Sequence, residues 1–497
     1  MNLIPILIAA TAIALPASAR PAVAAVAQPS AGQGGAQPPP PPGPPPSAPP
    51  SRPPAPPTEQ LRIAVPTRAM SLPDALEYAR KNQPSLLAAK ARLAAIRAET
   101  DIPRALYLPR VTATAQVFGG TENNTTAMYT ATYGIDVPRI GATAVGPTSM
   151  TPYASTLAGV GLRQEIFDFG RISALQEAAD AAAEAERGRT DTTRLDVLYS
   201  VENAFYSVQT AKGVLGAAEA AWSRSKLDYD TAVAGVMAGL REPIERTRAE
   251  ATLGRFEVAR VRARAGVATA QALFAAVVGV PETMLDTLGE AAPPAPSPTL
   301  QQAISSAFDN DPVLHVRRAL VVEQSARTRS IAAELRPDIS LTTTFTGRAG
   351  DATPTNGTLS DGSGFLPNVP NWDTGLVFTW PLLDFGVKAR ENASRAMEDA
   401  RQSEVQERLQ VVSAWVQRTY LDVVAAEQAL PGLEKTLAAA QANYEQAEAR
   451  FRNELGSSVE LSDAQALLTS AEVDLTIGKF ELLKARADLG RAVAENL

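Results

Sequence analysis

The sequence of 497 residues contains no cysteine. Disulfide bonds, zinc–thiolate sites and thiol catalysis are therefore excluded, and so is lipid attachment to a cysteine at a mature N-terminus. Aromatic residues make up only 5% of the chain, which is little for a compact core of this length. The net charge is −7 and no basic stripe stands out, so the composition argues against binding of nucleic acid.

Long apolar runs are also scarce. Leu3–Leu15 is a short apolar run of the export-signal type, and Ala17-Ser18-Ala19 or Ala25-Val26-Ala27 fits a small-x-small cleavage site, although no Lys or Arg precedes the run. We predict a signal peptide over residues 1–27, with a buried N-terminal helix as the alternative. No other apolar run reaches the ~18–20 residues that a membrane helix needs. The mature chain is thus expected either to stay soluble outside the cytoplasm or to enter a membrane as β-structure.

Residues 28–66 are rich in proline, with runs such as Pro38–Pro42. Such a composition gives an extended, poorly packed polyproline segment. We interpret it as a disordered tail, and a spacer from the export site is the alternative.

The chain contains an internal repeat. Ser71–Pro84 returns as Thr299–Pro312, and the same offset holds through Leu108–Val111 and Leu335–Ile339. A second block, Ile166–Arg171, returns as Leu382–Val387. Two copies are too few for a solenoid. We therefore predict a duplicated unit, with a first repeat over residues 67–290 and a second over residues 291–497.

Both copies predict the order helix, strand, long loop, strand, long helix, tight turn, helix. In the first copy we expect helices over 71–101, 171–238 and 244–280 and strands over 111–117 and 160–166. In the second we expect helices over 299–331, 387–453 and 458–493 and strands over 339–345 and 376–380. Each long helix is predicted to run uninterrupted. Its length matches the combined length of the two shorter helices of its copy placed end to end. These lengths predict an extended helical cylinder with strands at one end and turns at the other.

The strands alternate between polar and apolar residues, which is typical of a membrane β-barrel. The set expected to face a wet lumen is Thr112, Thr114, Gln116, Ser340, Thr342 and Thr344. The set expected to face lipid is Val111, Ala113, Val117, Ile339, Leu341, Phe345, Leu376, Phe378 and Trp380. Four strands cannot close a barrel, whereas three chains would supply twelve. A soluble α+β domain with half-buried sheets is the alternative.

This order of motifs resembles the outer membrane efflux protein family, the TolC-like channel-tunnels, over about residues 65–495. The residues that carry the resemblance are the starts at Ser71 and Thr299, Asn82-Gln83-Pro84, Asn310-Asp311-Pro312, the junctions with Asp168, Gly170, Asp384 and Gly386, and the turns Gly239-Leu240 and Leu455-Gly456-Ser457. The resemblance implies an α+β membrane fold. Long antiparallel helices form a coiled-coil barrel in the periplasm, and four strands per chain contribute to a trimeric 12-stranded barrel in the outer membrane.

The two Asp-Phe-Gly triplets, 168–170 and 384–386, also spell a kinase magnesium motif. No Gly-rich phosphate loop or catalytic-loop pattern accompanies them, which favours a structural role at a strand-to-helix bend. The single histidine, His315, aligns with Leu87 of the first copy, which favours helix packing over metal binding or acid–base chemistry. The sequence offers no nucleophile–base pair, metal cluster or nucleotide loop. It predicts a passive duct without cofactors rather than an enzyme.

Glu460 and Asp463 follow the second turn and lie three residues apart, so both point to one face of the last helix. In a trimer they would make a ring of carboxylates, and such rings favour cations. The resemblance identifies them with the family's acidic periplasmic entrance ring, and a solvated helix face is the alternative. Phe451 stands where a gate tyrosine is common and Gly456 where an arginine occurs. The hydrogen bonds that would hold the periplasmic entrance closed are therefore expected to be absent or to involve other residues.

The turns at Gly239-Leu240 and Leu455-Gly456 are expected to present helix-tip backbone to a periplasmic adaptor. The resemblance implies a homotrimeric exit duct of a tripartite efflux pump, in contact with outer-membrane lipid and driven by an inner-membrane pump of RND or ABC type. Alternatives are the outer-membrane component of a type I protein secretion system, metal efflux, a trimeric surface protein without transport, and a periplasmic enzyme or binding protein. The sequence leaves the exported substrate and the pump type open.

Overall fold

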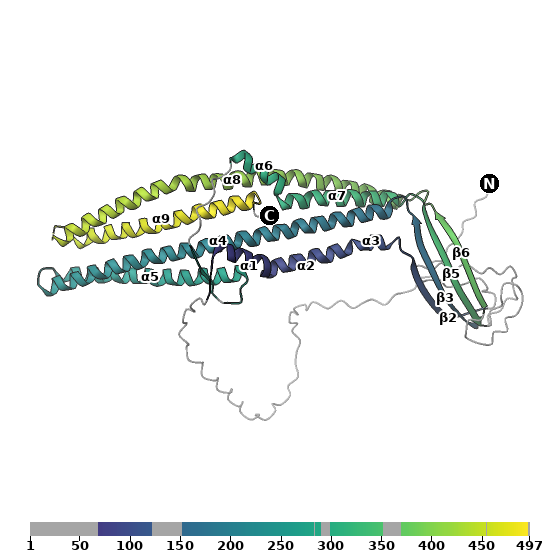
Figure 1. Ribbon diagram of the computed structural model, residues 1–497, viewed down its shortest axis with the longest axis horizontal. Coiled ribbons are helices and arrows are strands. Elements are labelled where there is room, and N and C mark those ends of the chain that lie inside the picture. Colours follow the sequence, from purple (N-terminus) through teal and green to yellow (C-terminus); the bar gives the residue numbers. More distant parts are fainter. Residues whose placement is uncertain are drawn as a thin grey trace, which may run out of the picture. The chain divides into compact units, whose positions relative to one another are not determined.

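The computed structural model describes residues 68–121, 152–282, 284–289, 299–350, 369–453 and 455–495. All of them belong to one compact unit, Arg62–Leu497. Within it, long helices join a four-stranded sheet (Figure 1). The predicted signal peptide and proline-rich segment lie outside the described residues.

The helices of the first copy are α1 (Leu72–Asn82), α2 (Pro84–Glu99), α3 (Asp101–Ala105), α4 (Arg171–Met237) and α5 (Pro243–Val278). The Ser71 hydroxyl caps α1 by accepting from the Asp74 amide. The single helix predicted over 71–101 is wrong, because the chain leaves the helical conformation at Gln83, where ψ is 121°. Pro84 explains this break, since proline disfavours the helical region for the residue before it.

The helices of the second copy are α6 (Leu300–Asn310), α7 (Pro312–Ala333), α8 (Phe385–Arg452) and α9 (Ser458–Ala492). The single helix predicted over 299–331 is likewise interrupted, at Asp311 before Pro312, for the same reason. The long helix predicted over 387–453 is confirmed as α8, which continues through Pro431 although proline disfavours a helix interior. Proline removes one hydrogen bond from a helix interior, and the neighbouring turns of this long helix continue on both sides of it.

The shorter helices pack along the two long helices, α4 and α8. α4 packs against α1, α2 and α3 along one part of its length and against α5 along another. α8 packs in the same way against α6 and α7 and then against α9. The predicted end-to-end arrangement of short helices along a long one is thus confirmed (Figure 1). α4 also contacts α7 and α9, which joins the two copies.

Small residues set the spacing of these helices. Ala174, Ala178, Ala181 and Ala185 are buried on one side of α4. At Gly188, a Cβ atom would lie 2.7 Å from Val316 Cγ2, so α4 and α7 approach to a distance that only glycine permits. Close packing by alanine and glycine accounts for the low aromatic content of the chain.

His315 does not take the packing position that the sequence predicted. The buried residues at the start of α7 are Pro312, Leu314 and Val316, so His315 falls on the opposite side and is exposed. Its Nε2 atom lies 2.8 Å from the carbonyl oxygen of Asp309. The alignment with Leu87 misled the prediction, because Leu87 is itself exposed.

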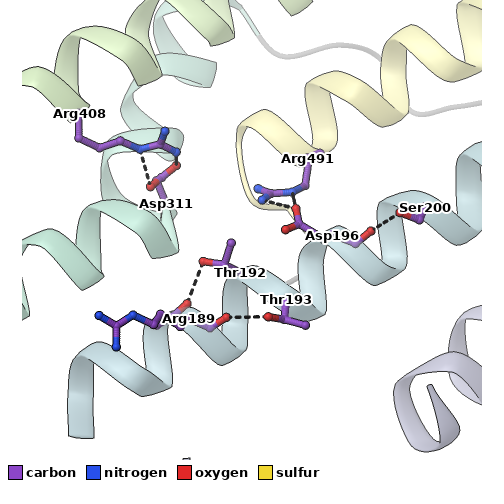
Figure 2. A network of polar contacts seen from close by, with 9 residues as sticks. Arg189, Thr192, Thr193, Asp196, Ser200, Asp311, Arg408 and Arg491 are labelled. Atoms are coloured by element: carbon purple, nitrogen blue, oxygen red, sulfur yellow. Dashed lines mark hydrogen bonds and ion pairs between the residues drawn. The ribbon is translucent and has the colours of Figure 1, made fainter. Parts of the chain in front are cut away.

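Two ion pairs join neighbouring helices (Figure 2). The first is largely buried, whereas the aspartate of the second is exposed. Arg408 of α8 lies 2.6 Å from Asp311, whose carboxylate also accepts from the Leu314 amide at the start of α7. Arg491 of α9 lies 2.6 Å from Asp196 of α4. The break at Asp311 is therefore joined to α8 by charge as well as by helix packing.

The main sheet has the order β2 (Arg110–Thr121), β3 (Pro152–Phe167), β5 (Asp338–Gly350) and β6 (Val369–Thr379), and every neighbouring pair is antiparallel. The strands are longer than predicted, because backbone pairing continues into Gly- and Thr-rich residues that break the apolar alternation. A small parallel pair, β1 (Ala69–Met70) with β4 (Asp286–Thr287), was not predicted, since two residues carry no pattern. β2 and β6 are the edges of the described sheet.

The register places the two predicted residue sets on opposite faces. Thr112 and Thr344 align across β3 on one face, and Val111 aligns with Leu162 on the other. The apolar face is the exposed one: Val117 is 76% exposed and Leu376 is 73% exposed, whereas Ser340 and Thr344 are buried. A sheet in a soluble domain turns its apolar face to the core and its polar face to water. This sheet does the reverse.

One helix corrects an expectation about apolar runs. By length and composition alone, α5 could cross a membrane, since it contains an 18-residue window of mean hydropathy 1.2. Its apolar character comes largely from alanine and valine, and it packs along α4 as one arm of a helical hairpin. Of this window, 28% is buried within the chain.

Candidate functional site at the helix tips

Two helical hairpins end in the turns that the sequence singled out. The first hairpin is α4 with α5, and the second is α8 with α9. Gly239 has φ +71°, a left-handed conformation that glycine adopts without strain, and it ends α4. In the second turn, the amides of Leu455 and Gly456 both donate to the Arg450 carbonyl. Leu240 and Leu455 are 70% and 72% exposed, so each turn presents a leucine side chain to its surroundings.

Arg241 joins the tips of the two hairpins. Its guanidinium carbon lies 3.9 Å from the centroid of the Phe451 ring, and its Nη2 atom donates to the Phe451 carbonyl at 3.3 Å. Its Nη1 atom pairs with Glu245 at 3.3 Å. Gly235 leaves room for this side chain, because a Cβ atom there would lie 2.7 Å from Arg241 Cδ. Arg241 was not among the predicted site residues, and its place directly after the Gly239-Leu240 turn is the one signal that the sequence gives for it.

Further contacts between the hairpins lie away from the turns. Arg224 of α4 forms a two-pronged pair with Glu472 of α9, at 3.1 and 2.8 Å. The hydroxyls of Thr252 on α5 and Ser462 on α9 lie 3.4 Å apart. The two hairpins are therefore held together by polar contacts that join residues about half the sequence apart.

The two predicted ring carboxylates have different neighbours. Glu460 Oε1 lies 3.2 Å from Arg450 Nε, so its charge is partly compensated within the second hairpin. Asp463, one turn further along α9, is exposed. It lines a cavity between the hairpins, and Arg248 of α5 lines the same cavity. The two residues share the first turns of α9, but only Glu460 has an ion-pair partner among the described residues.

The cavity beside Asp463 has a volume of about 300 Å³ and is lined by all four tip helices. Asp228 of α4 is one of its lining residues. Burial, reinforced by the nearby negative charge of Glu448, raises the pKa of Asp228 to about 6, although Arg452 and Arg224 act in the opposite direction. Burial also raises the pKa of the neighbouring Tyr444 to about 12.

The Asp-Phe-Gly triplets lie at the other end of the long helices, between strand and helix. Asp168 is buried and accepts hydrogen bonds from the Ile172 amide at 2.5 Å and the Tyr107 hydroxyl at 3.1 Å. Gly170 has φ +96° and directly precedes α4. Asp384 accepts from the amides of Gly386 and Val387 at 2.7 and 3.1 Å. Both aspartates thus satisfy free amides at the start of a helix.

In the described ranges of the chain, a metal site would require several His, Asp or Glu side chains close together. Within those ranges, no three His, Asp or Glu side chains lie close enough to hold a metal ion. The junction carboxylates of Asp168 and Asp384 instead accept from backbone amides, and Glu460 at the second tip pairs with Arg450.

A sequence model of the family described as "Outer membrane efflux protein" matches residues 75–280 and 303–495. The chain is also similar in fold to the outer-membrane channel OprN, with a TM-score of 0.68 at 20% identity over 87% of this chain and 94% of that one. For CusC the TM-score is 0.70 at 14% identity over 87% and 95%. For the CmeC outer membrane channel of Campylobacter jejuni it is 0.68 at 16% identity over 85% of each chain.

No curated protein sequence matches the chain significantly. The family match nevertheless spans most of the chain and covers both copies of the repeat. The chain therefore belongs to the outer membrane efflux protein family, the channel proteins of the bacterial outer membrane that extend into the periplasm.

Proposed function

We propose that the protein is a homotrimer in which three four-stranded sheets close a single twelve-stranded barrel in the outer membrane. The observation that carries this proposal is the inverted sheet, with Val117, Phe345 and Leu376 exposed and Ser340 buried. β2 and β6 are paired on one side only among the described strands, and an open edge exposes unpaired backbone groups that lipid cannot satisfy. Closure between chains pairs both edges and leaves the apolar face to lipid.

The trimer serves as the passive exit duct of a tripartite efflux pump. The family to which the chain belongs, together with the two hairpin tips that expose Leu240 and Leu455, supports this role. Energy comes from an inner-membrane pump, and a periplasmic adaptor contacts the turns at Gly239-Leu240 and Leu455-Gly456. In this scheme residues 1–27 are removed on export, residues 28–66 precede the duct, and the repeats 67–290 and 291–497 each supply half of the strands and helices.

Two measurements test this function together. Light scattering of the detergent-extracted protein is expected to give the mass of a trimer, and planar bilayers are expected to show discrete conductance steps. A stable monomer with the same strand content would contradict the barrel. A trimer without conductance would identify a surface or structural protein instead, and export of a polypeptide rather than small molecules in cells would identify type I secretion.

The tips are tested in cells. Leu240→Asp with Leu455→Asp places a charge on each exposed leucine, and we expect small-molecule export to fall while the trimer persists. Leu227→Asp is a matched control, because Leu227 is 56% exposed on α4 but lies more than two helical turns before the first hairpin's end. Export that is unchanged in the double variant would show that the tips only form turns.

The entrance ring is tested in bilayers. If Glu460 and Asp463 of three chains converge at the periplasmic mouth, their field concentrates cations there and weakens as salt rises. Replacing both by alanine is expected to lower cation selectivity and block by trivalent cations. Alanine at Glu398 and Asp399, acids far from the turn on α8, serves as the control. Equal selectivity of the wild type and the Glu460/Asp463 variant would show that these carboxylates lie on a solvated helix face and do not form a ring at the mouth.

A further inference from the structure

The cavity between the hairpin tips has the dimensions and walls of a small-ligand site. Its volume of about 300 Å³ lies at the lower end of the range of about 300–1,000 Å³ that is usual for such sites. Ala232 of α4, Ala249 of α5, Phe451 of α8 and Leu461 of α9 supply apolar wall from all four helices. A ligand in this cavity would contact both hairpins at once.

Two polar side chains of the cavity lining are left without partners. Asp228 Oδ2 is shielded from solvent and accepts no hydrogen bond from the described residues. The same holds for Ser458 Oγ, in the first turn of α9, as donor or acceptor. Ser457, its neighbour, caps α9 and is satisfied by the Glu460 amide. Buried polar groups are usually hydrogen-bonded, so an unpaired carboxylate and hydroxyl in one cavity lining indicate a missing donor.

The charges around the cavity favour a cation as that donor. Its lining carries Asp228, Glu245 and Asp463 against one arginine, Arg248. Glu245 is already paired with Arg241, so two carboxylates face a single cation. The charges nearest Asp228 from outside the lining are Arg224 on α4 and Glu448 and Arg452 on α8. Arg224 pairs with Glu472, and Arg452 pairs with Glu448, so neither pair changes the net negative charge of the lining. A metal ion would need several oxygen ligands, whereas these walls are largely apolar.

We propose that this cavity binds a small organic ammonium ion, whose charged head donates to Asp228 and whose apolar stem lies against Ala232, Ala249 and Leu461. Such a ligand matches the cavity in charge, size and polarity. It also bridges α4 and α9, so its binding stabilises the contact between the two hairpins. Binding does not depend on whether the protein conducts, and the site differs from the exposed carboxylate of Glu460.

The titration of Asp228 gives the proposal a pH signature. The carboxyl group has a raised pKa of about 6, so it is ionised above pH 6 and protonated below it. An ammonium ion binds the ionised form. Its affinity is therefore expected to be highest above pH 7 and to fall as the pH drops through 6.

The test uses the full-length protein in detergent and 4-fluorobenzylamine as the probe, observed by its fluorine NMR line width. We expect saturable binding at pH 7.5, at least tenfold weaker binding in Asp228→Asn, and unchanged binding in Asp230→Asn, an exposed acid two residues away. Binding is also expected to weaken at pH 5. The neutral 4-fluorobenzyl alcohol reports partitioning into detergent and is expected to show no saturable binding.

A second variant keeps the proposal testable if Asp228→Asn alters the assembly. Ala249→Leu fills the cavity without changing its charge and is expected to abolish binding, with the circular dichroism and hydrodynamic size of the wild type. Absence of saturable binding in the wild type would overturn the proposal. So would equal binding in Asp228→Asn, in Ala249→Leu or by the neutral alcohol.

Discussion

Truncation of Arg241 to alanine is expected to separate the tips of the two hairpins. The side chain is 13% exposed and makes two contacts across the hairpins, the stacking on the Phe451 ring and the hydrogen bond to the Phe451 carbonyl. A cation–π contact contributes about 0.5–2 kcal/mol. A hydrogen bond from a charged donor contributes about 1.5–3 kcal/mol. The pair with Glu245 lies within the first hairpin and does not hold the hairpins together.

The expected loss is about 2 kcal/mol, since coupled contacts add incompletely. A loss of this size shifts the equilibrium between joined and separated tips roughly thirtyfold, at about 1.4 kcal/mol per factor of ten. Arg241→Lys keeps the charge but loses the planar fork, so an intermediate effect is expected.

The assay exploits the absence of cysteine in the chain. Leu240→Cys and Leu455→Cys place one spin label on each exposed tip, and labelled chains are diluted with unlabelled ones so that distances within one chain dominate. Arg241→Ala is expected to lengthen and broaden the measured distance distribution. Arg255→Ala is the matched control, because within the described residues Arg255 stacks on the adjacent Phe256 of its own helix and not on the other hairpin. An unchanged distribution in Arg241→Ala would refute the assignment of Arg241 as the link.

Three further predictions concern stability, measured by guanidinium or thermal unfolding. Arg408→Met leaves a buried aspartate unpaired and is expected to cost about 3–5 kcal/mol, whereas Arg418→Met, at a side chain that is 81% exposed, is expected to cost under about 1 kcal/mol. Burial raises the pKa of Glu202 to about 7, so the native state loses stability as the pH rises from about 4 to 7. The free energy of unfolding of Glu202→Gln is therefore expected to match that of the wild type at pH 4 and to exceed it at pH 8 by on the order of 3 kcal/mol. Gly188→Ala is expected to destabilise by about 1–3 kcal/mol through overpacking, unlike Gly216→Ala, where a Cβ atom meets nothing within 4 Å. Equal effects within any of these pairs, or a pH-independent Glu202 variant, would contradict the reasoning.

The sequence by itself determined the parts of the fold that repeat along the chain. Apolar residues at helical spacing defined α4 to within one residue at its end, and the caps at Ser71 and Thr299 marked the start of each copy. Alternation separated the polar strand residues from the apolar ones, and the two sets lie on opposite faces of the sheet, since side chains on a strand alternate with a period of two. These signals are local, so the preferences of neighbouring residues suffice to predict the elements that they mark.

Some errors were also local. Pro84 and Pro312 stood in the sequence, and the rule for residues before proline predicts the breaks that were missed. The strands extended beyond the apolar alternation because hydrogen bonding to a neighbouring strand, not side-chain pattern, fixes where a strand ends.

Only the tertiary structure decided the chemistry at the tips. Arg241 meets Phe451 across about two hundred residues of sequence, and Asp228 forms its cavity with side chains of α5, α8 and α9. Each of these residues has an unremarkable local context, so no pattern along the chain marks it. Burial, the raised pKa of Asp228 and the link between hairpins arise when distant helices pack, because desolvation and charge interactions depend on distance in space rather than on separation in sequence.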